Sequence, residues 1–183
     1  MKNNILIGCD LHNTLLLSNE AWINAFLSFN PKIDAKKISN DIYSKKSRKE
    51  LAILYNIDYD ELLYKYYEKC LPNTKLLAFV KELQNKGFQV ILISSSSKEK
   101  VNKDLIKINN YISFDEVYTK ETFKKDNIND WNSVIKKYKA DFMIYIGNDY
   151  DEDIINNEKV ISVLSGHFFT ELKETGFLQE RGK

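Results

Sequence analysis

A short apolar run that ends in a carboxylate constrains this chain more than any other feature of its sequence. Residues 5–9 read Ile-Leu-Ile-Gly-Cys, and Asp10 follows them directly. A continuous apolar run of this length, rather than an alternation, is typical of a parallel strand buried on both faces. The carboxyl ends of such strands are where open α/β sheets bind their ligands. Asp10 is therefore predicted to lie at a ligand-binding edge of a sheet.

From residue 72 onward, apolar strand-like runs alternate with amphipathic helical segments. The predicted strands are residues 88–93, 114–118, 142–146 and 160–164, and the predicted helices between them are residues 74–86, 98–108 and 129–138. A last helix is predicted after His167. Alternating strands and helices are typical of an α/β fold with a parallel sheet and right-handed crossovers.

The segment between the first strand and this region has no strand pattern. Its periodicity predicts four helices. Ser18 and Asn19 can cap the first, Asp34 begins the second, Ser47 the third, and Asp58 or Asp60 the fourth. We therefore predict a small all-helical insert in residues 18–70 and an α/β core in residues 1–17 and 71–183.

The composition is that of a soluble globular protein. Its 27 basic and 26 acidic residues give a formal charge of +1, which favours neither a nucleic acid nor an anionic membrane as partner. No stretch approaches the length of a membrane span, and the N-terminal apolar run is too short for a signal peptide. We expect a cytoplasmic protein, monomeric or homodimeric.

Each of the first four predicted strands ends in a polar turn of a different chemical kind. Asp10 follows the first strand and Ser94 the second; lysines follow the third, and residues 148–153 form an acidic cluster after the fourth. If the strands are parallel, these turns share one edge of the sheet. Carboxylates there can hold Mg²⁺, and a lysine offsets negative charge. Ser94 and main-chain N–H groups can bind phosphoryl oxygens, so Asp10 could attack phosphorus in line.

The four turns, taken in order, resemble the four motifs of the haloacid dehalogenase (HAD) superfamily. The segments that carry the resemblance are Asp10-Leu11-His12-Asn13-Thr14-Leu15, Val90 to Ser94, Phe114 to Val117 with the lysines that follow, and Gly147 to Asp153. The insert occupies the place of that family's helical cap. The resemblance implies a Rossmann-like parallel sheet in the order 3-2-1-4-5 with helices on both faces, plus the cap.

The resemblance also implies roles for individual residues. Asp10 would be the nucleophile that forms an aspartyl-phosphate, and Thr14 would brace its turn. Mg²⁺ would be bound by the Asp10 carboxylate and the main-chain carbonyl of His12. Ser94 would bind the phosphoryl group, and Ser95 is a candidate for orienting the substrate.

His12 departs from the family pattern, which usually has an Asp two residues after the nucleophile. That Asp protonates the leaving oxygen and then activates water. Imidazole is a competent general acid and base near neutral pH, so His12 could do the same work. Alternatively, His12 only fills the position, in an enzyme that is slow at hydrolysis or does other chemistry.

The third and fourth motifs also leave alternatives. Lys120, Lys124 and Lys125 all lie in the loop of the third motif. The family often has a lysine and a proline there, followed six residues later by an aromatic residue in the next helix. By that resemblance, counting back six from Trp131 selects Lys125 as the phosphate-binding lysine, but the proline is absent, so Lys124 remains second. Asn148 stands where an Asp is usual. Asn148, Asp149 and Asp153 are therefore all candidate metal ligands, or the acidic residues simply begin a helix.

The predicted function is Mg²⁺-dependent hydrolysis of a small phosphate monoester. A second hypothesis keeps Asp10 as nucleophile but replaces the reaction with dehalogenation, carbon–phosphorus cleavage or phosphoryl transfer. A third is a catalytically degenerate binding protein, which the residues His12 and Asn148 motivate.

Overall fold

The computed structural model describes residues 4–44 and 46–165, which form two compact units. One unit contains the described residues up to Leu15 and those from Asn73 onward; the other is Leu16–Pro72. The helix predicted after His167 lies outside the described residues. Within those residues, no helix is both long and apolar enough to cross a membrane.

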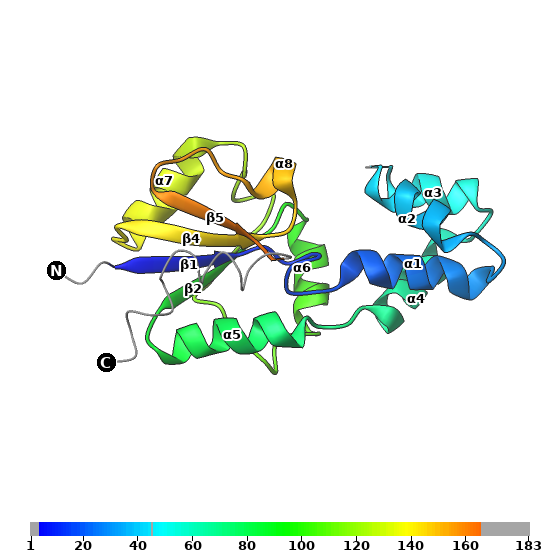
Figure 1. Ribbon diagram of the computed structural model, residues 1–183, viewed down its shortest axis with the longest axis horizontal. Helices are drawn as coiled ribbons and strands as arrows, with labels where there is room; N and C mark the ends of the chain where they lie inside the picture. Colours follow the sequence, from blue (N-terminus) through cyan, green and yellow to red (C-terminus); the bar gives the residue numbers. More distant parts are fainter. Residues whose placement is uncertain (1–3, 45, 166–183) are drawn as a thin grey trace. The chain divides into compact units, whose positions relative to one another are not determined.

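A parallel sheet organises the first unit. In the described residues its strands are β1 (Ile5–Cys9), β2 (Gln89–Ile93), β3 (Glu116–Tyr118), β4 (Phe142–Gly147) and β5 (Val160–Leu164). Their order is β3-β2-β1-β4-β5, so β1 lies between β2 and β4 (Figure 1). Strands β2 and β3 lie on one side of β1, and strands β4 and β5 lie on the other. The predicted α/β fold and strand order are confirmed.

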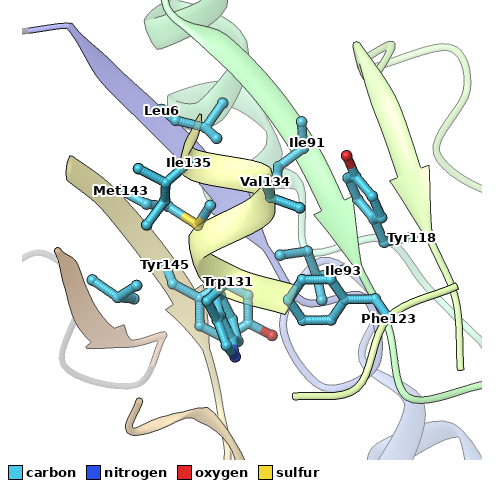
Figure 2. Packing of buried hydrophobic residues seen from close by; sticks show 11 residues of the cluster. Leu6, Ile91, Ile93, Tyr118, Phe123, Trp131, Val134, Ile135, Met143 and Tyr145 are labelled. Atoms are coloured by element: carbon cyan, nitrogen blue, oxygen red, sulfur yellow. The ribbon is translucent and has the colours of Figure 1, made fainter. Parts of the chain in front are cut away.

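Helices cover the sheet because its central strands are apolar on both faces. The helices of this unit, as far as Ser165, are α5 (Thr74–Asn85), α6 (Lys98–Leu105), α7 (Ile128–Lys137) and the single-turn α8 (Tyr150–Asp153). Consecutive residues of β1, β2 and β4 are buried, as expected for a covered parallel sheet. Figure 2 shows Trp131, Val134 and Ile135 of α7 packed over one face of these strands.

Gly87 ends α5 as its sequence position predicts. The helix stops at Asn85, and Gly87 has φ +86°, the left-handed conformation that glycine adopts without steric cost. The chain then enters β2, which leads to the Ser94 turn.

The second unit is helical. Its helices are α1 (Ser18–Phe29), α2 (Ala35–Tyr43), α3 (Arg48–Leu54) and α4 (Tyr59–Lys69). Trp22 of α1 stacks on Tyr66 of α4, with ring centroids 4.1 Å apart.

These helices begin at the predicted residues, with one exception. Asp34, Ser47 and Asp58 each accept a hydrogen bond from a main-chain N–H in the first turn of the helix that follows. The predicted cap of the first helix by Ser18 or Asn19 is wrong. That helix already begins at Ser18, and the preceding Leu17 is held by a main-chain hydrogen bond to Leu71 rather than by a side-chain cap.

Candidate active site

Asp10 is the first residue after β1, at the point where the strand order changes direction. Its main-chain N–H donates to the carbonyl of Ile146 in β4 at 2.8 Å, so the sheet pairing extends to Asp10. Its side chain is buried, with only 6% of the residue exposed. Open α/β sheets bind ligands at such switch points. The Asp10 carboxylate therefore lies where the topology favours a ligand.

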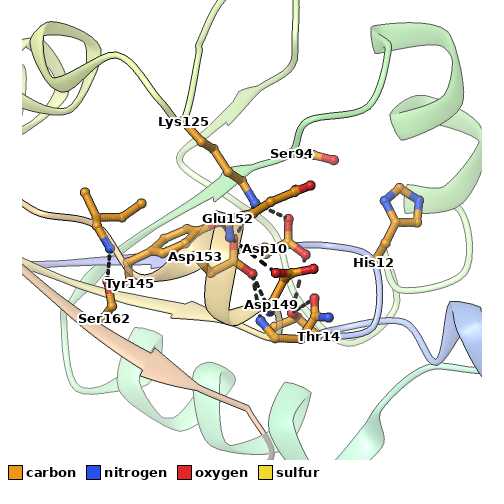
Figure 3. Close-up of polar contacts among 12 residues, drawn as sticks. Asp10, His12, Thr14, Ser94, Lys125, Tyr145, Asp149, Glu152, Asp153 and Ser162 are labelled. Atoms are coloured by element: carbon orange, nitrogen blue, oxygen red, sulfur yellow. Dashed lines mark hydrogen bonds and ion pairs between the residues drawn. The ribbon is translucent and has the colours of Figure 1, made fainter. Parts of the chain in front are cut away.

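The ammonium group of Lys125 lies between two buried carboxylates (Figure 3). Its Nζ donates to Asp10 Oδ1 at 2.9 Å and to Asp153 Oδ1 at 2.7 Å. Burial alone would lower the pKa of Lys125, but the attraction of Asp10 and Asp153 outweighs burial and raises it. A lysine that stays charged beside Asp10 offsets the negative charge of an approaching anion.

Burial has the largest effect on the pKa of Asp10. It raises the pKa of that carboxyl above the ordinary value; Lys125 opposes the effect and the charge of Asp153 reinforces it. The two carboxylates share one ammonium, so additional positive charge near Asp10 would favour its ionised form.

Asp153 is surrounded by protein donors. Its Oδ2 accepts from the main-chain N–H groups of Asn148 at 2.8 Å and Asp149 at 3.0 Å, and its Oδ1 accepts from Lys125 and from the hydroxyl of Tyr145. A Cβ atom on Gly147 would overlap the side chain of Asp153, so only glycine permits this packing. In this arrangement Asp153 orients the turn after β4 and Lys125.

Two oxygens that could bind a cation lie near the hydroxyl of Thr14. The Oγ1 atom of Thr14 is 3.4 Å from Asp10 Oδ2 and 3.2 Å from Asn148 Oδ1, and it donates to one of them at a time. Thr14 is buried, and its main-chain carbonyl accepts from the side-chain amide of Asn73 at 3.0 Å. The turn after β1 is thus joined to the turn after β4.

Asp149 starts α8. Its Oδ1 accepts from the main-chain N–H groups of Asp151 at 2.8 Å and Glu152 at 3.3 Å. Among residues 4–44 and 46–165, no three His, Cys, Asp or Glu side chains are grouped so that they could hold a metal ion. The donor set at this edge is smaller and consists of oxygens, which fits Mg²⁺, because that ion uses one or two carboxylates and completes its shell with water and substrate phosphate.

The four serines after β2 have separate positions. Ser94 is buried; its N–H donates to the carbonyl of Tyr118 at 3.0 Å, and its hydroxyl accepts from the N–H of Ser96 at 3.3 Å. Ser95 is exposed, and Ser97 caps α6. Figure 3 shows Ser94 at the same end of the strands as Lys125 and Asp10.

The ring of His12 lies beside α6, apart from the group around Asp10 (Figure 3). Its Nε2 is 2.7 Å from Asp104 Oδ2 and 2.9 Å from Lys100 Nζ, and its Nδ1 is 3.4 Å from the hydroxyl of Ser96. Asp104 is fully buried and also accepts from Lys100 at 2.6 Å. Burial would raise the pKa of Asp104, but His12 and Lys100 outweigh burial and lower it.

The motifs do not predict several of these residues as part of the site. Lys100 and Asp104 are spaced as an ordinary helical ion pair, and nothing in the sequence shows that they meet His12. Tyr145 offers a weak signal, since its hydroxyl interrupts an otherwise apolar strand and needs a partner when buried. Of the two candidate lysines, Lys125 reaches Asp10, whereas Lys124 is exposed and its main-chain N–H donates to Asp130.

An open cleft of about 580 Å³ adjoins the site within the sheet unit. It is lined by Ser95 of the loop after β2 and by residues of the loop after β3, the start of α7 and the segment around α8, which include Lys120, Lys124, Lys125, Trp131 and Glu152. Its volume is in the range of small-molecule sites.

The fold is similar to those of several solved structures. A hydrolase from Streptococcus pneumoniae TIGR4 is 21% identical, with 82% of this chain and 85% of that chain covered and a TM-score of 0.59. A protein assigned as a beta-phosphoglucomutase from Thermotoga maritima is 15% identical, with 92% and 98% covered and a TM-score of 0.62. A HAD-superfamily hydrolase of subfamily IA from Geobacter sulfurreducens PCA is 13% identical, with 81% and 80% covered and a TM-score of 0.51.

Further matches include structures of a predicted phosphoglycolate phosphatase and of a dehalogenase. The chain therefore has the fold of the HAD-like hydrolases, as its motifs indicated. Neither a protein-family model nor a curated protein sequence matches it.

Proposed function

We propose that this protein is a Mg²⁺-dependent hydrolase of small phosphate monoesters, with Asp10 as the nucleophile. The observation that carries the proposal is the buried Asp10 carboxylate at the switch point, in direct contact with the ammonium of Lys125. Structures with this fold include a predicted phosphoglycolate phosphatase and a protein assigned as a beta-phosphoglucomutase, which is consistent with phosphate chemistry.

Asp10 begins the reaction by in-line attack of a carboxylate oxygen on phosphorus. The bond between phosphorus and the ester oxygen breaks, and the leaving oxygen takes a proton. Water then attacks the aspartyl-phosphate, which releases inorganic phosphate and restores the carboxylate. Lys125 offsets the charge of both anions, and Ser94 together with nearby main-chain N–H groups binds the phosphoryl oxygens.

The residues proposed to hold Mg²⁺ are Asp10 and Asn148 through their side-chain oxygens and His12 through its main-chain carbonyl, with Asp149 as a further candidate. A bound Mg²⁺ would supply positive charge that screens the phosphoryl oxygens from Asp10. We assign Asp153 the role of orienting Lys125 and the turn after β4, because protein donors occupy both of its oxygens.

His12 is the candidate acid for the leaving oxygen and base for the water. Its Nε2 is engaged by Asp104 and Lys100, so Nδ1 is the nitrogen with the weaker contact, at 3.4 Å from Ser96. This engagement also favours a second candidate function, in which water is activated poorly and the phosphoryl group passes to another hydroxyl acceptor. Adding alcohol or sugar acceptors to the assay separates the two reactions, since transfer yields a new phosphate ester and hydrolysis yields inorganic phosphate.

A phosphate-release assay on a generic phosphomonoester and a panel of metabolites, with Mg²⁺ and with a chelator, tests the proposal. We expect release that needs Mg²⁺ and that Asp10→Asn abolishes, while Asp60→Asn, at an exposed carboxylate of α4, leaves it unchanged. Absence of release from every ester would overturn the proposal. Halide release without a metal would instead support dehalogenation.

A further inference from the structure

The indole of Trp131 makes a polar contact with the segment that carries Lys125. Trp131 is completely buried in α7, and its Nε1–H donates to the main-chain carbonyl of Lys125 at 2.8 Å. A buried indole N–H requires an acceptor, and here the acceptor belongs to the lysine that contacts Asp10.

The loop around Lys125 is held by the first turn of α7. The carboxylate of Asp130 accepts from the main-chain N–H of Lys124 at 2.8 Å and from the side-chain amide of Asn127 at 3.0 Å. Together with Trp131, these contacts fix the main chain on both sides of the Lys125 side chain. The lysine thus starts from a restrained backbone before it reaches Asp10.

The Trp131 ring also contacts Tyr145, which lies beside the Lys125 ammonium. It lies edge-to-face on Tyr145, with centroids 4.9 Å apart, and the Tyr145 hydroxyl donates to the Asp153 oxygen that also accepts from Lys125. The Nζ atom of Lys125 is 5.4 Å from the centroid of the Tyr145 ring. Figure 2 shows Trp131 and Tyr145 side by side under α7. Trp131 therefore contacts both the main-chain carbonyl of Lys125 and the tyrosine that lies beside its ammonium.

We propose that Trp131 is a positioning residue for the reaction at Asp10, and that it acts through Lys125. Its N–H fixes the carbonyl from which the lysine extends, and its ring fixes the tyrosine that braces Asp153. The proposal rests on the function proposed above, in which Lys125 neutralises charge during phosphoryl transfer. Errors of about 1 Å in such groups can cost about a hundredfold in rate, so loss of a single restraint is expected to cost about tenfold.

The test compares Trp131→Phe with Val134→Ala. Phenylalanine keeps an aromatic ring but removes the N–H, whereas Val134→Ala removes packing from the same buried cluster and keeps the Trp131 N–H that donates to Lys125. With a generic phosphomonoester and Mg²⁺, Trp131→Phe is expected to lower kcat about tenfold with KM changed less than about threefold. Val134→Ala is expected to keep the kcat of the wild type at temperatures below its unfolding transition.

A second measurement needs neither metal nor substrate. Lysine labelled at Cε gives an NMR signal for Lys125, assigned by its absence in Lys125→Met. Trp131→Phe is expected to shift or broaden this signal, and Val134→Ala is expected to leave it in place. In the Lys125→Met background, Trp131→Phe should cause no further loss of turnover.

Equal effects of Trp131→Phe and Val134→Ala on kcat and on the Lys125 signal would overturn the inference, since both would then act only on packing. The failure of the proposed function is a different result: wild-type protein that releases no phosphate. In that case the Lys125 signal alone decides whether Trp131 positions the lysine.

Discussion

The ammonium of Lys125 contacts two buried carboxylates, that of Asp10 directly after β1 and that of Asp153 in α8. Two negative charges against one positive charge is a costly arrangement in a buried site, and burial is the main cause that raises the pKa of Asp10. Such an imbalance is useful where a cation or a phosphoryl group is to be bound.

The raised pKa predicts how Asp10→Asn changes stability. A carboxyl whose folded pKa lies above its unfolded value of about 3.9 destabilises the fold as pH rises through the folded pKa. Without Mg²⁺, Asp10→Asn should therefore raise the free energy of unfolding at neutral pH by about 0.5–2 kcal/mol, the usual size of a stabilising substitution. This gain in the free energy of unfolding should shrink as the pH is lowered toward the pKa of the unfolded state. Denaturant unfolding at several pH values measures it, and a loss of stability at neutral pH would contradict the account.

Gly147 gives a second prediction for a single residue. Its missing side chain leaves room for Asp153, so Gly147→Ala should destabilise the protein by about 1–3 kcal/mol and displace Lys125, with loss of turnover. Gly87→Ala is the matched control: its left-handed backbone makes alanine unfavourable by about 1 kcal/mol, but it should leave kcat intact. Thermal unfolding and turnover of both variants check this; equal loss of turnover would show that the effect is general.

At the scale of the elements, α6 is joined to the turn after β1 by a partly buried polar cluster of His12, Lys100 and Asp104. Asp104 accepts from both His12 and Lys100, and its Oδ1 is buried without a hydrogen-bond partner among the described residues. The cluster connects the loop after β2 to the residues that follow Asp10, so α6 affects the shape of the site without contributing a motif to it.

Asp104→Asn should lower the free energy of unfolding at neutral pH by about 1–3 kcal/mol, because it removes the charge that His12 and Lys100 share. The folded pKa of Asp104 is lowered, so its contribution is present above the unfolded value and is lost as pH falls through the folded pKa. The difference between wild type and variant should therefore narrow in acid. Glu99→Gln, at an exposed ion pair on the same helix, should change stability by less than about 0.5 kcal/mol. Similar losses in the two variants would contradict the role assigned to Asp104.

The strands and their end residues were predictable from sequence because they follow one local rule, an apolar run and then a polar turn. The spacing to Trp131 also singled out Lys125, which is the lysine that reaches Asp10. The orientation of side chains was not predictable. Asp153 faces Lys125 and His12 faces Asp104 because of contacts between residues distant in sequence. Such contacts leave no trace in spacing or periodicity.

At the scale of the whole molecule, the chain leaves the sheet unit and returns to it at one place. The N–H of Asn73 donates to the carbonyl of Leu15 at 2.9 Å, and Leu16 pairs with Pro72 in an isolated antiparallel bridge. The helical unit between them has its own buried aromatic core. The two units therefore satisfy the usual requirement for independent folding, a hydrophobic core of their own.

Replacing residues 17–71 with a short Gly/Ser linker is predicted to leave the sheet unit folded, since the two ends to be joined are already adjacent. Circular dichroism and a cooperative melting transition measure this outcome. A trimmed protein that is unfolded or aggregated would show that the helical unit is required for the sheet to form.

The central claim is that Asp10 accepts a phosphoryl group. Rapid acid quenching of the protein during turnover of a phosphomonoester with Mg²⁺, followed by peptide mass spectrometry, tests it most directly. We expect the added mass of one phosphoryl group on the peptide that contains Asp10, labile to hydroxylamine and absent in Asp10→Asn. Turnover without this adduct, or an adduct on a different residue, would contradict it.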